Sequence, residues 1–220
     1  MKVLSRRSFC KYTALGTSIA LLKTPNIVAF ADDGLIELEP ESFMAEINSW
    51  YHSNGLSVSL DSIEGECYRL TIDEFEQVVN ILQSFYIAKS VEHSSSFSID
   101  SENNVSPCEI MPINFTRTNS HTLNCYFEGL VPGSLHVNVS ISATIDAARD
   151  NIISSSGTAY ETSSMNLDSV SFGTVSTSNN SPSSGSISYS VPCTAKFKWT
   201  VNSLTFSNTM NETFTGSVSF

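Results

Sequence analysis

Two long stretches of this chain alternate strictly between apolar and polar side chains. They are GSLHVNVSISATID (133–146) and ISYSVPCTAKFKWTV (187–201). A period of two places all the apolar side chains of a strand on one face, whereas a helix would scatter them around its axis. Both stretches therefore predict antiparallel strands with one buried and one wet face. Pro192 cannot donate to a ladder, which predicts an edge position or a bulge there.

Shorter runs of the same kind accompany these two stretches. They are IMPINF, HTLNCYF, GTAYETS, SVSFGTV and NETFTGSVSF, separated by turn-forming segments such as NNSPSSG. Together the runs predict about seven strands, each with one face toward the core and the other toward solvent. This repetition favours an antiparallel β-sandwich over residues 108–220.

The part before residue 92 has a helical period instead. Pro40 suits the first turn of a helix over 40–54, which Gly55 ends. Thr71 followed by Glu74 matches a capping box, and apolar residues recurring every three or four positions predict a second helix over about 72–90. Between the helices, LSVSL and CYRLTI predict a short hairpin. The expected fold is α+β overall: a small helix–hairpin–helix part, then the sandwich.

The motif LTIDEFEQVVNIL and the closing alternating strands resemble secreted proteins of Gram-positive bacteria in which a short helix–hairpin–helix part precedes a β-domain. The resemblance implies no activity. The expected organisation is a signal segment over 1–31, an acidic region over 32–92, a polar linker over 93–107 and a β-sandwich domain over 108–220. The charge supports this boundary, because residues 32–109 hold 16 of the 22 acidic residues.

The N-terminal segment resembles a twin-arginine export signal, with paired arginines, an apolar stretch too short to span a bilayer, and a small-x-small cleavage site. The export motif consists of Arg6, Arg7, Phe9 and Lys11, and the cleavage site of Ala29 and Ala31. We therefore expect an exported protein, extracellular or in the cell envelope, cleaved before Asp32 and without an integral membrane segment afterwards.

The chain beyond residue 31 is strongly acidic. All 22 Asp and Glu residues lie there, against six of the 11 Lys and Arg residues. Such a charge repels nucleic acid and anionic membranes, and the sequence holds no basic patch. A nucleic-acid partner is therefore excluded, and we expect an extracellular protein or glycan.

Four cysteines remain after cleavage of the signal. An even number in an exported domain favours disulfides. Strand parity places Cys125 and Cys193 inside the sandwich, so Cys125–Cys193 and Cys67–Cys108 are the expected pairs. Buried thiols are the alternative, because cysteine is a common core residue.

The sequence carries no motif for catalysis, metal or cofactor binding. It lacks CxxC, HxH, HExxH and GxSxG, so no metal site and no cofactor are predicted, although a cofactor held by scattered ligands stays open. The four histidines share no spacing and are expected on the surface or in loops. Calcium at the acidic turn of Asp61, Glu64 and Glu66 is less favoured than a solvated hairpin.

These observations favour a non-catalytic extracellular binding module. The alternative is a secreted hydrolase of glycan or cell wall that uses a carboxylate pair, which can meet in space without any sequence motif. The candidates for that pair are Glu128, Asp146, Glu161 and Asp168. A structural surface protein is a third alternative.

Overall fold

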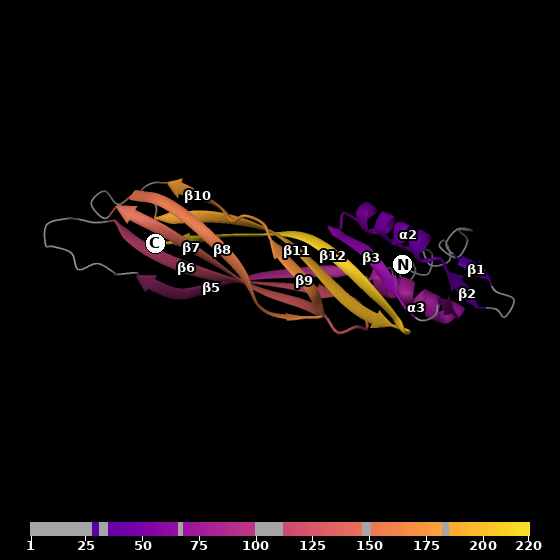
Figure 1. The fold of residues 1–220 in the computed structure, drawn as a ribbon. Helices are drawn as coiled ribbons and strands as arrows, with labels where there is room; N and C mark the ends of the chain where they lie inside the picture. Colours follow the sequence, from indigo (N-terminus) through magenta and orange to yellow (C-terminus); the bar gives the residue numbers. More distant parts are fainter. Residues whose placement is uncertain (1–27, 31–34, 66–67, 100–111, 147–150, 182–184) are drawn as a thin grey trace, which may run out of the picture. The chain divides into compact units, whose positions relative to one another are not determined.

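The protein is mostly β-structure in several antiparallel sheets, with two helices among the described residues (Figure 1). The computed structural model describes residues 28–30, 35–65, 68–99, 112–146, 151–181 and 185–220. The helices are α2 (Pro40–Ser53) and α3 (Ile72–Gln83). The strands are β1 (Val28–Phe30), β2 (Ile36–Leu38), β3 (Val58–Glu64), β4 (Arg69–Leu70), β5 (Tyr86–Ile99), β6 (Ile113–Tyr126), β7 (Gly133–Asp146), β8 (Asn151–Met165), β9 (Leu167–Phe172), β10 (Ser176–Ser181), β11 (Ser186–Val201) and β12 (Leu204–Ser219).

The two long alternating stretches form strands with the bounds that their pattern predicts. β7 covers all of 133–146, and β11 covers 187–201 with one more residue at its start. Alternate side chains are buried along both strands, because each sheet has one face in the core. The strand orders are β1-β2-β4, β10-β11-β12-β3 with β9 also on β11, and β5-β6-β7-β8.

The chain divides into two compact units that interleave along the sequence. The first unit contains the described residues of Met1–Ile87, together with Cys125–Gly133 and Lys196–Met210. The second contains those of Ala88–Asn124, Ser134–Ala195 and Asn211–Phe220. The long strands β6, β11 and β12 each contribute two or more residues to both units, and β5 and β7 also begin in the first unit and continue in the second.

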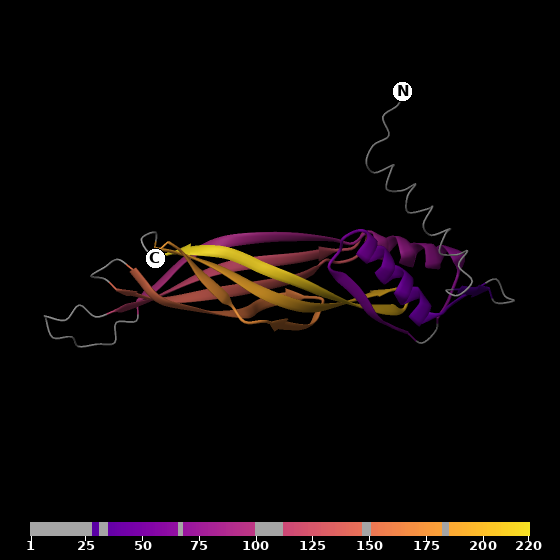
Figure 2. The ribbon, with the colours of Figure 1, turned by 90° about the horizontal axis from the view of Figure 1, so that it is seen from above.

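Both predicted helices lie in the first unit, where they pack side by side (Figures 1 and 2). The Thr71 hydroxyl accepts from the Glu74 backbone N–H while the Glu74 carboxylate accepts from the Thr71 N–H, which confirms the capping box. The Phe43 and Phe75 rings meet edge to face, with their centroids 5.9 Å apart. Neither described helix has the length and apolar character needed to cross a membrane.

Helix α3 ends at Gln83, earlier than the predicted residue 90. The Ser84 hydroxyl donates to the Ile81 carbonyl at 2.6 Å and accepts from the Glu128 backbone N–H at 2.6 Å, so the chain leaves the helix there. The apolar pattern that suggested a longer helix continues instead into β5. This strand also covers the start of the segment expected to be a linker, and residues 100–111 lie outside the described part of the chain.

The predicted hairpin between the helices is wrong. β3 pairs with β12, with Ile63 opposite Phe206, whereas β4 pairs with β2. Asn48 of α2 fixes β3 further, because its amide donates to the Leu60 carbonyl at 2.9 Å and accepts from the Leu60 N–H at 2.6 Å. A partner from the distant end of the chain therefore replaces the neighbouring strand.

The second unit is sandwich-like, with a core between facing sheets. His121 of β6 lies against Tyr189 of β11 and Phe214 of β12, with ring centroids 5.7 and 5.1 Å apart. The runs predicted as separate strands near IMPINF and HTLNCYF form one strand, β6. β11 is not an edge strand, since it lies between β10 and β12. Beside the break between β9 and β10, the Pro192 carbonyl accepts a hydrogen bond from the Gly173 N–H at 2.8 Å.

Candidate functional site

The two described cysteines are thiols, and the predicted Cys125–Cys193 disulfide is not formed. Both side chains are buried, as strand parity predicts, and the Cys125 Sγ lies 3.5 Å from the Met210 Sδ. Parity assigns the face of a strand but not the neighbour across the core, which explains the wrong pairing. Cys67 and Cys108 lie outside the described residues, so their predicted bridge stays a prediction.

Burial makes Cys193 a poor nucleophile. Burial, with a smaller contribution from the Glu212 carboxylate, raises the pKa of the Cys193 thiol to about 11. The thiolate is the reactive form of cysteine, so at neutral pH this side chain is protonated and inert. A cysteine-based catalytic site at this position is therefore not supported.

Alkylation tests directly that Cys125 and Cys193 are thiols and that burial makes Cys193 unreactive in the native protein. In denaturant and without reductant, Cys125 and Cys193 should both react with iodoacetamide. In the native protein at pH 8, Cys193 should react about 100-fold more slowly, because a pKa two units higher lowers the thiolate fraction by that factor. Peptide mapping by mass spectrometry reads both results, and a peptide cross-linked through Cys125 and Cys193 would contradict the thiol assignment.

The acidic residues proposed for a carboxylate pair are spread along the fold. Glu128 lies in the first unit, in the turn after β6, and Asp168 lies on β9. In the ladder of β7 and β8, Asp146 is opposite Asn151, whereas Glu161 is opposite Val137. The stretch of β7 from residue 137 to residue 146 spans about 30 Å at the usual rise of a strand. Glycoside hydrolysis needs carboxyl groups about 5–10 Å apart, so Asp146 and Glu161 do not form such a pair.

The acidic turn proposed as a weak calcium site is part of β3. The Asp61 carboxylate accepts hydrogen bonds from the Ser59 and Thr209 hydroxyls. Glu64 ends the strand and is exposed, and Glu66 lies outside the described residues. Within the described part of the chain, no three His, Cys, Asp or Glu side chains are grouped as metal ligands.

One histidine was expected on the surface but is buried in the second unit. His121 is only 2% exposed, and its Nε2 lies 2.7 Å from the Tyr189 hydroxyl. The Asn119 amide donates to the same hydroxyl at 2.9 Å and to the Ser217 carbonyl at 3.1 Å. Burial raises the pKa of Tyr189 above its ordinary value. Strand parity could have predicted the burial of His121, because Asn119 and His121 share a strand face with Leu123.

The outer face of β6 and β7 in the second unit carries a continuous ladder of polar side chains. Hydrogen bonds join the two strands in five successive rows, at distances of 2.7 to 3.0 Å between the polar atoms. The rows are Asn114–Thr144, Thr116–Ser142, Thr118–Ser140, Ser120–Asn138 and Thr122–His136. Every member is uncharged or a histidine. We call this surface, with its continuation on β8, the polar face.

Strand β8 extends the polar face and adds one aromatic ring. Tyr160 is directly opposite Asn138 in the ladder, and the Asn138 amide donates to the Tyr160 hydroxyl at 3.4 Å. The Tyr160 side chain is 48% exposed. A hollow farther along the face is lined by hydroxyl and amide groups, among them Asn114, Ser142 and Ser156. The polar face thus combines an exposed ring with a field of hydroxyl groups.

A groove beside α3 in the first unit has a different character. Its charged lining consists of Asp73, Glu76 and Glu128, around an apolar part formed by Ile81, Leu130 and Val201. These carboxylates repel phosphate groups, in keeping with the acidic composition.

The chain matches no family model, no curated protein and no solved structure. Of the predicted signal residues, Ala29 lies in β1, and the other five, Arg6, Arg7, Phe9, Lys11 and Ala31, lie outside the described residues.

Proposed function

We propose that this protein is an exported, non-catalytic binding module that holds an uncharged glycan on the polar face of β6, β7 and β8. The observation that carries the proposal is the five-row ladder of hydrogen-bonded Ser, Thr, Asn and His side chains beside an exposed tyrosine. The twin-arginine motif of the sequence supports export through that pathway, to the cell envelope or beyond.

The chemistry of the polar face suits a sugar. A Ser or Thr hydroxyl has one donor and two acceptor positions, so a group that makes one cross-strand bond can still bind a ligand hydroxyl. The cross-strand bonds also hold the side chains in place, which lowers the entropy lost on binding. The Tyr160 ring offers an apolar surface on which the C–H groups of a pyranose can lie.

Other partner classes fit the polar face less well. Protein interfaces have an apolar core, and nucleic-acid sites have clustered Lys and Arg. The ladder has neither, since it consists of Ser, Thr and Asn side chains and one His.

Retention on neutral polysaccharides tests the proposal. The mature protein should bind at least one insoluble neutral glycan, such as cellulose, chitin or xylan. Tyr160→Ala should weaken binding about two- to twelvefold, because a ring contact contributes about 0.5–1.5 kcal/mol. Depletion from solution at a series of glycan concentrations measures the affinity.

The matched control is Tyr86→Ala. Tyr86 is also exposed, at 54%, but it belongs to the first unit, where it stacks on Tyr126. Its removal should leave glycan binding unchanged. Equal losses in the two variants, or no retention on any neutral glycan, would contradict the proposal.

A further inference from the structure

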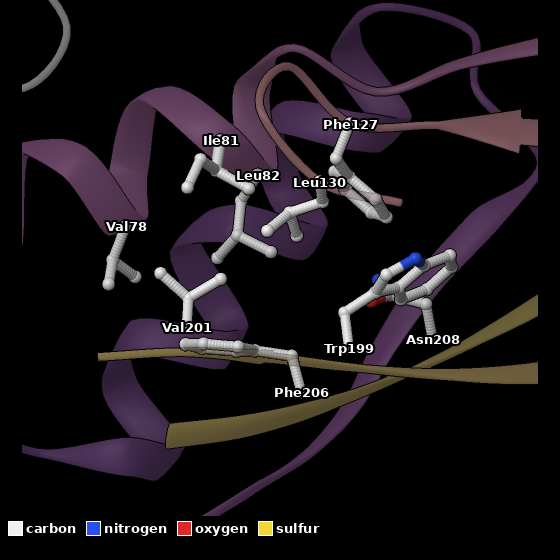
Figure 3. Close-up of a pocket in the computed structure, with 9 residues that line it drawn as sticks. All are labelled: Val78, Ile81, Leu82, Phe127, Leu130, Trp199, Val201, Phe206 and Asn208. Atoms are coloured by element: carbon white, nitrogen blue, oxygen red, sulfur yellow. The ribbon is translucent and has the colours of Figure 1, made fainter. Parts of the chain in front are cut away.

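A small cavity, not fully closed, lies in the first unit, between α3, the turn after β6, and the strands β11 and β12 (Figure 3). Most of its lining is apolar, including Val78 and Leu82 of α3 and Phe206 of β12. Its volume of about 10 Å³ is close to the smallest that admits one water molecule. A larger ligand does not fit without movement of the lining side chains.

Two polar side chains line this otherwise apolar cavity, and each has a buried atom without a hydrogen-bond partner among the described residues. These atoms are the Trp199 Nε1 and the Asn208 Oδ1. Trp199 is 5% exposed and Asn208 is fully buried. Figure 3 shows both side chains on the side of the cavity away from Val78. One atom is a donor and the other an acceptor, which is the pair of roles that one water can satisfy.

The orientation of the Asn208 amide follows from the hydrogen bond that its Nδ2 makes. The Nδ2 donates to the Ser59 carbonyl at 3.3 Å. Exchanging the two ends would place an oxygen against that carbonyl, so the Oδ1 is the end left to accept a bond. The Tyr51 hydroxyl approaches the same amide but makes no hydrogen bond of normal geometry, and it is buried too.

We propose that this cavity is a binding site for a single long-lived water molecule. The water accepts a hydrogen bond from the Trp199 Nε1–H and donates one to the Asn208 Oδ1. Buried polar groups without partners are strongly disfavoured, and internal waters commonly satisfy two to four such groups. This assignment concerns the core of the first unit and is independent of glycan binding by the second.

Nuclear magnetic resonance tests the proposal on the unmodified chain. With only two tryptophans, Trp50 and Trp199, the indole N–H signals are assigned by the loss of one signal in Trp50→Phe. In an ¹⁵N-edited rotating-frame spectrum, the Trp199 indole proton should show a cross peak to water opposite in sign to the diagonal. That sign marks a dipolar contact, whereas proton exchange gives the same sign as the diagonal. An exchange peak alone, or no peak, would overturn the proposal.

Two variants identify the source of the cross peak. Tyr51→Phe removes a nearby hydroxyl whose proton could exchange with water and imitate bound water, and the cross peak should survive it. Asn208→Leu removes the acceptor and occupies space in the cavity, so the cross peak should disappear while the indole signal stays dispersed. Loss of the peak in Tyr51→Phe, or its persistence in Asn208→Leu, would each refute the assignment.

Discussion

Phe75→Ala should lower the free energy of unfolding by about 3–5 kcal/mol, the range for deleting a buried phenylalanine side chain. Phe75 is fully buried, and its ring packs against Phe43, which joins α3 to α2. The truncated side chain leaves a cavity that the helices cannot close without giving up other contacts. Since a domain of this size is stable by only about 5–15 kcal/mol, the loss is a large fraction of the total.

Urea unfolding followed by tryptophan fluorescence measures this effect. Both tryptophans, Trp50 and Trp199, belong to the first unit, so the signal reports on the unit that contains Phe75. Ile72→Ala is the control, because Ile72 begins the same helix but is 46% exposed, and it should change the free energy by no more than about 0.5 kcal/mol. A change below about 1 kcal/mol for Phe75→Ala would show that the two rings do not pack as described.

Local patterns predicted local structure well. The alternation of 133–146 gave the bounds of β7, and the Thr71–Glu74 capping box gave the start of α3. These signals are strong because each depends on residues only two to four positions apart. The end of α3 was predicted less well, since Phe85 and Tyr86 continue the apolar pattern across the point where the chain changes to β5.

Pairing partners could not be predicted from such patterns. β3 pairs with β12, whose residues follow it by more than a hundred positions, and nothing in either segment specifies the other. The same limit produced the wrong disulfide, because parity gave the correct face for Cys125 and Cys193 but no distance between them.

The residues that meet at the two sites depend on strand parity and on register, and only parity can be read from the sequence. Tyr160 is opposite Asn138 in a ladder whose register shifts at two places, so the sequence does not show which β8 side chains lie beside the β7 part of the polar face. A second register shift separates Ser207 from Asn208, and both of these adjacent residues are buried. A regular strand would expose one of them. Asn208 shares the parity of the buried Leu204, Phe206 and Met210, so its burial follows the alternation of β12, whereas Ser207 is the buried exception beside the register shift.

Raising the pH from 9 to 11 should destabilise the native state by about 2 kcal/mol through Cys193 alone. Its thiol has a pKa of about 11 in the folded protein and an ordinary value near 9. Between these values the unfolded chain loses the proton while the folded chain keeps it, so the free energy of unfolding falls as the pH rises. Each pKa unit corresponds to about 1.4 kcal/mol. The stabilisation is complete below pH 9 and is lost as the pH passes 11.

The slope of stability against pH separates this effect from general alkaline damage. Cys193→Ala should be less stable than the wild type at pH 7, because a buried atom is removed, but its stability should fall less steeply between pH 9 and 11. The control is Cys125→Ala, which removes the other buried thiol but retains Cys193. Its stability should still show the decrease between pH 9 and 11 that the Cys193 thiol causes. The buried hydroxyls of Tyr51 and Tyr189, whose pKa values are also raised by burial, add a further loss above pH 10 in all three proteins. Urea midpoints at pH 7, 9, 10 and 11 measure the slopes, and parallel curves for wild type and Cys193→Ala would show that the Cys193 thiol is not protected from ionisation by burial.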